Sequence, residues 1–312
     1  MIWSDDRNLS LSGEAASPLS GEAGTPCFGE AGPQDVGVIG FGRMAQALVL
    51  PLIEAGLIDP ARLRAAVASE ASAERLRQAH QLTVGTDPLQ AWQAPVVLLA
   101  VKPQQLDAVA EAVAAADSVA AAVTVAAADA VEPSPPRLLI SVLAGVTLAR
   151  LQRLFPGCRC VRAVPNTPCL VRAGLTGLSW GEGLSAGQQE WVRSLFARVG
   201  EVLVLHEPQL DAFLALTSSG PAFVALVAEA MADGAVASGL PRPLAQHLAH
   251  RTLAGTAALL QERELHPGQL KDMVTSPAGT TIAGLRQLER AGLRSALIEA
   301  VVAAAERSRE LA

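Results

Sequence analysis

The sequence predicts an α/β fold, in which a doubly wound parallel sheet is followed by an all-helical second domain. Short apolar runs alternate with helix-like segments over most of the chain, and a glycine-rich turn follows the first run. After about residue 206 the strand signals stop, and apolar residues recur at helical spacing only. We therefore expect a Rossmann-type dinucleotide-binding domain over residues 35–206 and a helical domain over residues 207–312.

The expected strands are the apolar runs at 36–39, 63–68, 96–101, 138–143, 160–164 and 202–205. The expected helices cover 44–55, 221–239, 243–262, 267–274, 280–291 and 293–310. The stretch 108–136 is longer than a crossover between parallel strands needs. Pro133, Pro135 and Pro136 must break any helix at its end, so we interpret 117–136 as a surface insertion.

Residues 1–34 differ from the rest of the chain. LSGEA occurs twice, at 11–15 and 19–23, and few apolar residues are present to anchor this segment. We expect a disordered tail, because small and polar residues cannot offset the entropy of ordering. Asp5 and Asp6, without an apolar run, argue against a signal peptide.

Composition excludes several classes of protein. The formal net charge is -6 and there is no basic stripe, so a nucleic-acid partner is not expected. The apolar stretch 118–128 is too short to span a bilayer, so no membrane partner is expected. The four cysteines form no CxxC pair, which favours reduced thiols over a disulfide framework or a metal site. We expect a cytoplasmic protein without a metal.

The first motif is GFGRMA at 40–45, which lies directly after a predicted strand and opens a predicted helix. This is the GxGxxA form of the dinucleotide fingerprint. Gly40 permits the tight turn, Gly42 lets the backbone approach a pyrophosphate, and Ala45 allows the helix to pack on the strand. The helix N-terminus offers its free N–H groups to the phosphates, so we expect a bound dinucleotide.

The residues after the second strand bear on the choice of dinucleotide. An acidic residue there usually holds a ribose hydroxyl and selects NADH, whereas a small hydroxyl residue suits the 2′-phosphate of NADPH. The chain offers both, because Ser69 is followed by Glu70. We favour NADPH and keep NADH as the alternative.

Three further segments have two readings each. Lys102 ends a buried strand in the run AVKP and meets either cofactor or solvent; the chain has only one other lysine, Lys271. The run ISVLAG at 140–145 ends in either a nicotinamide-ribose contact or an ordinary turn. The rigid run PNTP at 165–168 either lines the crevice or forms a structured loop.

The most informative segment is HPGQLKDMVTSPAGTTI at 266–282. It predicts a short helix, a Ser-Pro-Ala-Gly turn and a new helix that begins near Thr280. The N–H groups of Gly279, Thr280 and Thr281 would then offer a site for a carboxylate, and the Thr281 hydroxyl could face the molecule that carries it. Simple helix capping by Thr280 is the alternative, although it does not account for the whole run.

Taken together, these motifs resemble the pyrroline-5-carboxylate reductase family. The matching segments occur in family order from residue 36 to the C-terminus: IGFGRMA (39–45), AVKP (100–103), ISVLAG (140–145), PNTP (165–168), SSGPAF (218–223) and the segment 266–289. The resemblance implies NAD(P)H-dependent reduction of the C=N bond of 1-pyrroline-5-carboxylate to L-proline, the last step of proline biosynthesis. It also implies that the helical domain dimerises, that dimers assemble further, for example into a ring, and that substrate lies between neighbouring subunits.

The resemblance also implies roles for individual residues. The expected cofactor contacts are Gly40, Phe41, Gly42, Arg43, Met44, Ser69, Ala100, Val101, Lys102, Pro103, Ala144 and Gly145. The expected substrate-binding residues are Glu207, Met273, Ser276, Gly279, Thr280 and Thr281, with the Thr281 hydroxyl at the ring nitrogen as the catalytic group and Glu264 shaping the pocket. The reaction needs mainly positioning, because a protonated imine accepts hydride readily.

The chain departs from the family pattern at three places. Ala278 replaces the first glycine of the usual SPGGTT, and Phe223 replaces a frequent tyrosine. Asp87 stands where an asparagine often contacts the adenosine end, and its charge would repel a 2′-phosphate.

Other functions fit the sequence less well. A β-hydroxyacid dehydrogenase uses a lysine in its central helix, and no lysine lies between Lys102 and Lys271. A short-chain dehydrogenase needs a Tyr-Lys pair, and the chain has no tyrosine. Reduction of a different imine remains an alternative. A non-catalytic NADPH-binding sensor would keep the glycine turn without needing SPAGTT.

Overall fold

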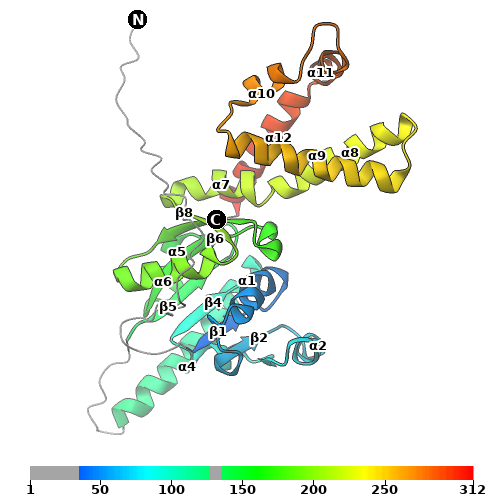
Figure 1. Cartoon of the computed structure of the whole chain (residues 1–312). Helices are drawn as coiled ribbons and strands as arrows, with labels where there is room; N and C mark the ends of the chain where they lie inside the picture. Colours follow the sequence, from blue (N-terminus) through cyan, green and yellow to red (C-terminus); the bar gives the residue numbers. More distant parts are fainter. Residues whose placement is uncertain (1–34, 127–134, 312) are drawn as a thin grey trace, which may run out of the picture.

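A computed structural model describes residues 35–126 and 135–311, and the side chains of 119–126 are not described. The predicted tail therefore lies outside the described residues, as does most of the Pro-rich end of the predicted insertion. Within the described part, the chain folds into a sheet covered by helices and a second group of helices that extends away from it (Figure 1). The predicted fold class, a Rossmann-type sheet followed by an all-helical domain, is confirmed.

The sheet has eight strands in the order β3-β2-β1-β4-β5-β6-β7-β8. Every neighbouring pair is parallel except β6 and β7, which are antiparallel. The order reverses at β1, which pairs with β2 on one side and with β4 on the other. The strands are β1 Val36–Ile39, β2 Leu63–Ala66, β3 Thr83–Gly85, β4 Val96–Leu99, β5 Arg137–Ser141, β6 Cys158–Val164, β7 Gly174–Trp180 and β8 Gly200–Val204.

Two hydrophobic cores lie on opposite faces of this sheet. One face packs against α1 (Arg43–Glu54), α2 (Glu70–His80) and α6 (Ala186–Ala197). The other packs against α3 (Pro88–Trp92), α4 (Leu106–Ala126) and α5 (Leu148–Leu154). Apolar residues fill both faces, as expected for a largely parallel sheet whose helices cover it on both sides. Short 3₁₀ helices, η1 Pro60–Arg62, η2 Pro103–Gln105, η3 Thr167–Val171 and η4 Glu207–Gln209, connect these elements.

The predicted insertion begins as a continuation of α4. This helix runs to Ala126, and Asp117 within it accepts hydrogen bonds from the Trp92 indole and from Arg137, at 3.2 Å each. Residues 117–126 are therefore not a loop. The alanine-rich sequence favours this long helix up to Ala126, the last described residue before the gap.

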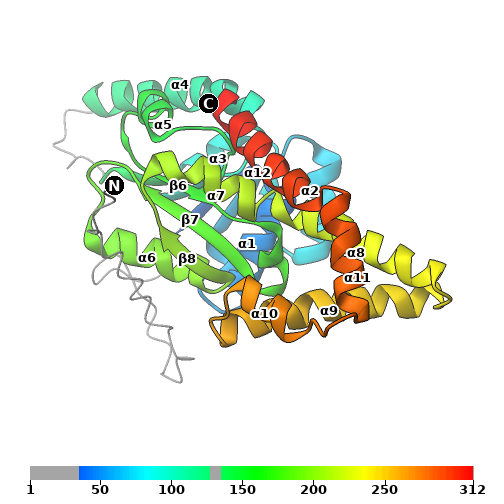
Figure 2. The same ribbon diagram turned by 90° about the horizontal axis from the view of Figure 1, so that it is seen from above.

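The second domain contains α7 Leu210–Thr217, α8 Gly220–Ala237, α9 Arg242–Glu262, α10 Pro267–Met273, α11 Thr280–Arg290 and α12 Leu293–Glu310. Helices α8 and α9 form an antiparallel hairpin that projects from the sheet domain, and α12 returns to pack along α7 (Figures 1 and 2). The sequence predicted every helix of this domain except α7. Its small buried core is mostly alanine, namely Ala232, Ala245 and Ala249.

Candidate functional site

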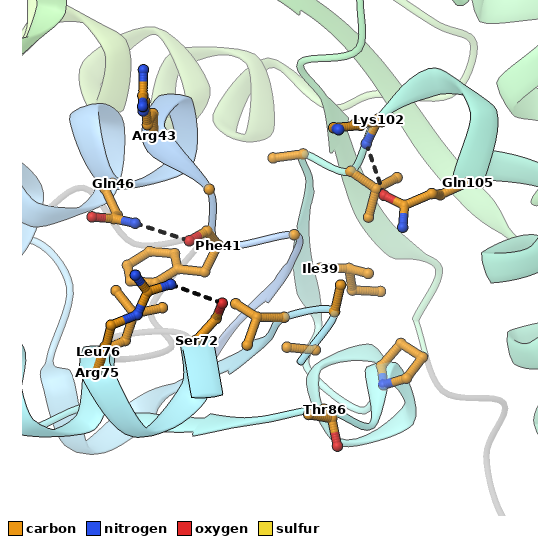
Figure 3. Close-up of a pocket in the computed structure, with 18 of the residues that line it drawn as sticks. Ile39, Phe41, Arg43, Gln46, Ser72, Arg75, Leu76, Thr86, Lys102 and Gln105 are labelled. Atoms are coloured by element: carbon orange, nitrogen blue, oxygen red, sulfur yellow. Dashed lines mark hydrogen bonds between the residues drawn. The ribbon is translucent and has the colours of Figure 1, made fainter. Parts of the chain in front are cut away.

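A cleft of about 730 Å³ lies at the carboxyl ends of β1, β2 and β4 (Figure 3). The strand order reverses between these strands, and ligands of open α/β sheets bind at such a switch point. Its walls come from the turn after β1, the end of β2, the exposed face of α2 and the turn after β4. The dinucleotide site predicted from GFGRMA therefore has a cavity in the expected place.

The glycine turn has the geometry that a dinucleotide requires. Gly40 has a φ of 95°, and a Cβ there would stand 2.5 Å from the backbone nitrogen of Val101, so no other residue fits without a shift. At Gly42 a Cβ would meet no heavy atom within 4 Å, so this backbone is open to a ligand. No side chain caps the N-terminus of α1 at Gly42, which leaves the first-turn amides to bind an anion.

The charge of the cleft also suits a dinucleotide. Four basic side chains line it, from Arg43, Arg75, His80 and Lys102, and among the described residues no Asp or Glu does. The Asp87 carboxylate accepts the N–H of Leu89 at 2.9 Å and caps α3. Asp87 does not itself line the cleft, but its neighbours Thr86 and Pro88 do, so the repulsion of a 2′-phosphate that its charge predicts stays a prediction.

The predicted cofactor residues divide into two groups. Those that line the cleft are Gly40, Phe41, Gly42, Arg43, Ala100, Val101 and Lys102. Those that do not are Met44, Ser69, Pro103, Ala144 and Gly145. Gly145 is buried, and a Cβ on it would stand 2.8 Å from the Leu311 Cβ at the end of the chain.

Sequence reasoning missed several residues of the cleft. Polar side chains from α1, α2 and the turns line it in addition to those predicted: Gln46, Ser72, Arg75, His80, Thr86 and Gln105. The signal in α2 was available, since Ser72 and Arg75 are three residues apart and so share a helical face.

The PNTP run forms a structured loop. Asn166 is 4% exposed, its Nδ2 donates to the carbonyl of Thr217 at 2.9 Å, and its Oδ1 accepts the N–H of Leu175 at 2.8 Å. The Ser218 hydroxyl donates to the carbonyl of Pro165 at 3.1 Å. Both polar groups of the Asn166 side chain therefore have structural partners, one in β7 of the sheet and one at the end of α7, as the structured-loop reading predicts.

The turn before α11 leaves the N-terminus of that helix without a side-chain cap. Gly279 is the N-cap of α11, with no side-chain cap, so Thr280 does not cap the helix as the simpler reading required. The Gly279 N–H donates to the carbonyl of Ser276 at 3.1 Å, and a Cβ on Gly279 would stand 2.3 Å from the Ser276 hydroxyl. Ala278 has a left-handed φ of 57°, so the turn survives the missing glycine with local strain.

Glu207 and Met273 differ in their surroundings. Glu207 is held at the junction of the domains, where its Oε1 accepts the N–H of Leu148 at 2.6 Å and the Nη1 of Arg162 at 3.2 Å. The Met273 side chain is 69% exposed on α10. Glu264 has a left-handed φ of 49° just before α10.

In one chain the cleft and this turn lie apart. No residue of the turn 276–281 lines the described cleft, and α10 and α11 stand on the far side of the helical domain from β1 and α2 (Figure 1). Every residue of α10 and α11 is at least partly exposed. The two predicted halves of the site are therefore not joined within a single chain.

The helical domain presents broad apolar faces to its surroundings. Val224, Leu226 and Ile298 are 53%, 67% and 55% exposed. Within the described residues, the stretch Glu207–Ala237 is the one helical segment long and apolar enough to cross a membrane, by length and composition only. It replaces the stretch 118–128 as the most membrane-like part of the chain. Large exposed apolar faces also mark protein–protein interfaces.

Comparisons with known proteins account for both domains. Residues 207–311 match the family model "Pyrroline-5-carboxylate reductase dimerisation", and residues 35–130 match the model "NADP oxidoreductase coenzyme F420-dependent". The match over 207–311 and the exposed apolar faces support a homo-oligomer.

Individual relatives match over nearly their whole length. The pyrroline-5-carboxylate reductase of Synechocystis is 43% identical over 88% of this chain and 97% of the relative. The structure of the Coxiella burnetii enzyme matches with a TM-score of 0.74 and 34% identity, over 90% of this chain and 99% of that one. The Plasmodium falciparum enzyme, solved with NADP bound, matches with a TM-score of 0.76 and 25% identity, over 89% and 98%. The chain therefore belongs to the pyrroline-5-carboxylate reductase family.

Proposed function

We propose that this protein transfers a hydride from NAD(P)H to the C=N carbon of 1-pyrroline-5-carboxylate and so forms L-proline. One observation carries the proposal: the same chain has a dinucleotide cleft without lining carboxylates and an uncapped helix N-terminus in the turn before α11. The first suits a phosphate-bearing cofactor and the second suits a small carboxylate substrate. The family relatives named above carry this activity in their names.

The cofactor would be held mainly by backbone. The turn at Gly40 and Gly42 and the first amides of α1 would receive the pyrophosphate, and Lys102 in the turn after β4 would meet phosphate or ribose. Ala144 and Gly145 would approach the nicotinamide end. The bound nicotinamide supplies the hydride, so the chain itself needs no redox group.

The substrate would be held by the turn before α11. The amides of Thr280 and Thr281 would clamp the carboxylate, while the Gly279 N–H, expected from the sequence to join them, donates to Ser276 and supports the turn. The Thr281 hydroxyl would bond the ring nitrogen and hold the imine carbon toward the cofactor. Met273 would cover the ring, and Glu207 would form part of the wall from the junction of the domains.

The assembly would complete the site. Because the cleft and the turn lie apart in one chain, a second chain must bring its turn to the first chain's cleft. A dimer with two-fold symmetry would build two such sites, and dimers could associate further into a ring. Free buried thiols at Cys160 and Cys169 support a reducing cytoplasmic location.

Turnover is the direct test. Purified protein should consume NADPH or NADH with pyrroline-5-carboxylate and release proline. Thr281→Ala should lower kcat/KM by roughly 10- to 100-fold, in the range of a lost transition-state hydrogen bond, while Thr281→Ser should retain most of it. Unchanged kinetics in the alanine variant would remove Thr281 from the mechanism. NADPH binding without turnover would favour a non-catalytic sensor or a different imine.

Mixing two inactive variants tests the shared site. Gly42→Ala should block the cleft, because its Cβ would enter the space open to the ligand, and Thr281→Ala should disable the turn. After the two variants are unfolded and refolded together, about half of the dimers are mixed. In each mixed dimer one of the two sites combines an intact cleft with an intact turn, so up to about a quarter of wild-type activity should return. No recovery above the separate variants would place both halves of a working site in one chain.

A further inference from the structure

We infer that Arg75 and Ser72 of α2 form a subsite for the 2′-phosphate of NADPH, and that this pair, rather than Glu70, decides the cofactor preference. The inference rests on the proposed use of a nicotinamide dinucleotide and adds the residues that select between its two forms. It concerns the end of the cleft at β2 and α2, on the opposite side from Lys102 and Gln105 (Figure 3).

Two serine hydroxyls and one arginine guanidinium at this end of the cleft are joined by hydrogen bonds. The Arg75 Nη2 donates to the Ser72 hydroxyl oxygen at 3.1 Å, and the Ser69 hydroxyl donates to the same oxygen at 3.0 Å. Ser72 and Arg75 line the cleft, while Ser69 is the N-cap that follows β2. With its oxygen accepting twice, the Ser72 hydroxyl has its one proton left to donate to an anionic oxygen.

Arg75 can serve a phosphate because no carboxylate of the described residues is paired with it. It is exposed, its guanidinium donates to the Ser72 hydroxyl, and no Asp or Glu of the described part of the chain lines the cleft beside it. An arginine offers several N–H donors in one plane and is always charged, which matches a phosphate dianion. The extra phosphate of NADPH adds charge close to –2 near neutral pH.

Glu70 is turned to a different partner. It follows Ser69 at the position where NADH-selective proteins place a ribose-binding carboxylate. Here its Oε1 accepts from the Arg77 Nη2, and the same nitrogen donates to Glu74 at 2.9 Å. The hydrogen bond with Glu70 is the main cause that raises the pKa of Arg77. Glu70 does not line the cleft.

The two possible roles of Glu70 predict opposite cofactor preferences. If Glu70 read the ribose, its carboxylate would repel the 2′-phosphate and NADH would bind better. With Glu70 and Glu74 both bonded to Arg77, the local charge that faces the ligand is the positive charge of Arg75. The arrangement therefore favours NADPH.

Direct binding of cofactor to the intact protein tests this without relying on turnover. Kd values for NADPH and NADH, from quenching of intrinsic fluorescence or calorimetry, should favour NADPH. Arg75→Ala should weaken NADPH binding by at least about tenfold and change NADH binding by less than about twofold, since one charge-assisted contact to phosphate is lost. Ser72→Ala should cause a smaller loss in the same direction.

Fragments isolate the phosphate itself. Adenosine 2′,5′-bisphosphate should compete better than ADP against the wild type, and Arg75→Ala should remove that advantage. Arg193→Ala is the matched control, because it removes the same charge from the exposed face of α6, away from the cleft. It should leave both affinities unchanged.

The variant Glu70→Gln tests whether Glu70 binds the cofactor ribose or only pairs with Arg77. It should leave NADH affinity unchanged; a loss of tenfold or more would make Glu70 the ribose reader and overturn the inference. Equal NADPH affinity in Arg75→Ala and wild type would also overturn it, while leaving the proposed reductase activity intact. Failure of the wild type to bind either cofactor would instead refute the proposed function along with it.

Discussion

The prediction that tests the architecture most directly concerns Arg162, a buried arginine at the junction of the domains. Its side chain is 2% exposed on β6, and its two terminal nitrogens reach Glu207 at 3.2 Å and Asp211 at 3.3 Å. Glu207 also accepts the N–H of Leu148, the first residue of α5, and Asp211 accepts the hydroxyl of Ser308 in α12 at 2.8 Å. One guanidinium therefore links the sheet, α5, α7 and α12.

Arg162→Met keeps most of the volume and removes the charge. The substitution leaves the carboxylates of Glu207 and Asp211 without their arginine partner, and these two side chains are only 27% and 16% exposed. Breaking a buried pair from one side costs about 3–5 kcal/mol. Because each carboxylate keeps one donor, at Leu148 and Ser308, we expect the lower end, about 3 kcal/mol. For a protein of this size that lowers Tm by roughly 6–12 °C.

The assay is thermal and urea unfolding at fixed protomer concentration, because an oligomer's apparent stability depends on concentration. The matched comparison is the triple variant Arg162→Met, Glu207→Gln, Asp211→Asn, in which no charge remains in the network. It should recover much of the loss, since neutral replacement of a buried ion group is far less costly than an orphaned charge. A single variant within about 1 kcal/mol of wild type, or a triple variant no better than the single one, would refute the reasoning.

Three further predictions concern the loop, the turn and the thiols. Asn166→Ala should destabilise the protein by about 2–4 kcal/mol in urea unfolding, because it leaves the buried carbonyl of Thr217 and the part-buried N–H of Leu175 without their partner; Asn166→Asp, which places a buried charged acceptor against the Thr217 carbonyl, should cost at least as much. Ala278→Gly should relieve a left-handed φ of 57° and raise the stability by up to about 1 kcal/mol without changing KM for substrate, and a lower Tm would contradict this. Burial raises the pKa of Cys158 to about 11 and that of Cys160 to about 12, from an ordinary value near 9. The folded thiols stay protonated while the unfolded ones ionise, so stability should be lost as pH rises from about 9 toward 12, and a Cys158→Ala, Cys160→Ala variant should lose less over that range.

The parts of the fold that the sequence predicts are those with local signals. The strand, turn and helix around Gly40 are specified by an apolar run, two glycines and a helical repeat within about twenty residues, and all three were found. The helices α8 to α12 were found within one or two residues for the same reason. Long periodic segments carry their own evidence, because a helix forms from residues that are close in sequence.

The missed elements depend on contacts between distant residues. The strand β7, GLTGLSW, has no continuous apolar run, because two of its positions are glycines that close packing against neighbouring elements requires. A Cβ at Gly177 would stand 2.9 Å from the Leu210 side chain, so α7 lies directly on this strand. The three-residue strand β3 is too short to show alternation, and the antiparallel pairing of β6 with β7 has no local signal. The helix α7 was missed because it begins without a capping side chain or an N-terminal proline, whereas the shorter α10 has both.

In the candidate site, too, the sequence predicts what depends on local signals and misses what depends on contacts between distant residues. Motifs located the glycine turn and the turn before α11 as separate segments, since each depends on backbone geometry that nearby residues specify. Which of Ser69, Glu70 and Asp87 faces a cofactor could not be read from the sequence, because the answer depends on the partners of Glu70 and Asp87. Glu207 illustrates the limit: its partners Leu148 and Arg162 are 59 and 45 residues away.

The hydrogen-bond network of Arg162 lies at the junction between the sheet and the helical domain. This position gives the junction, or joint, a role in the proposed reaction. Hydride transfer to a protonated imine needs no acid–base pair, so the rate depends on how well two ligands are held at near-attack distance. The cleft that would hold one ligand belongs to the sheet, and the turn that would hold the other belongs to helices beyond η4 and α7. Arg162 and Asn166 are the buried polar groups that fix those helices to the sheet. A loosened joint would therefore displace one ligand relative to the other, and Arg162→Lys, in a protein that still folds, should lower kcat more than it weakens NADPH binding. Equal loss in both would mean that the joint stabilises the fold without setting the geometry of transfer.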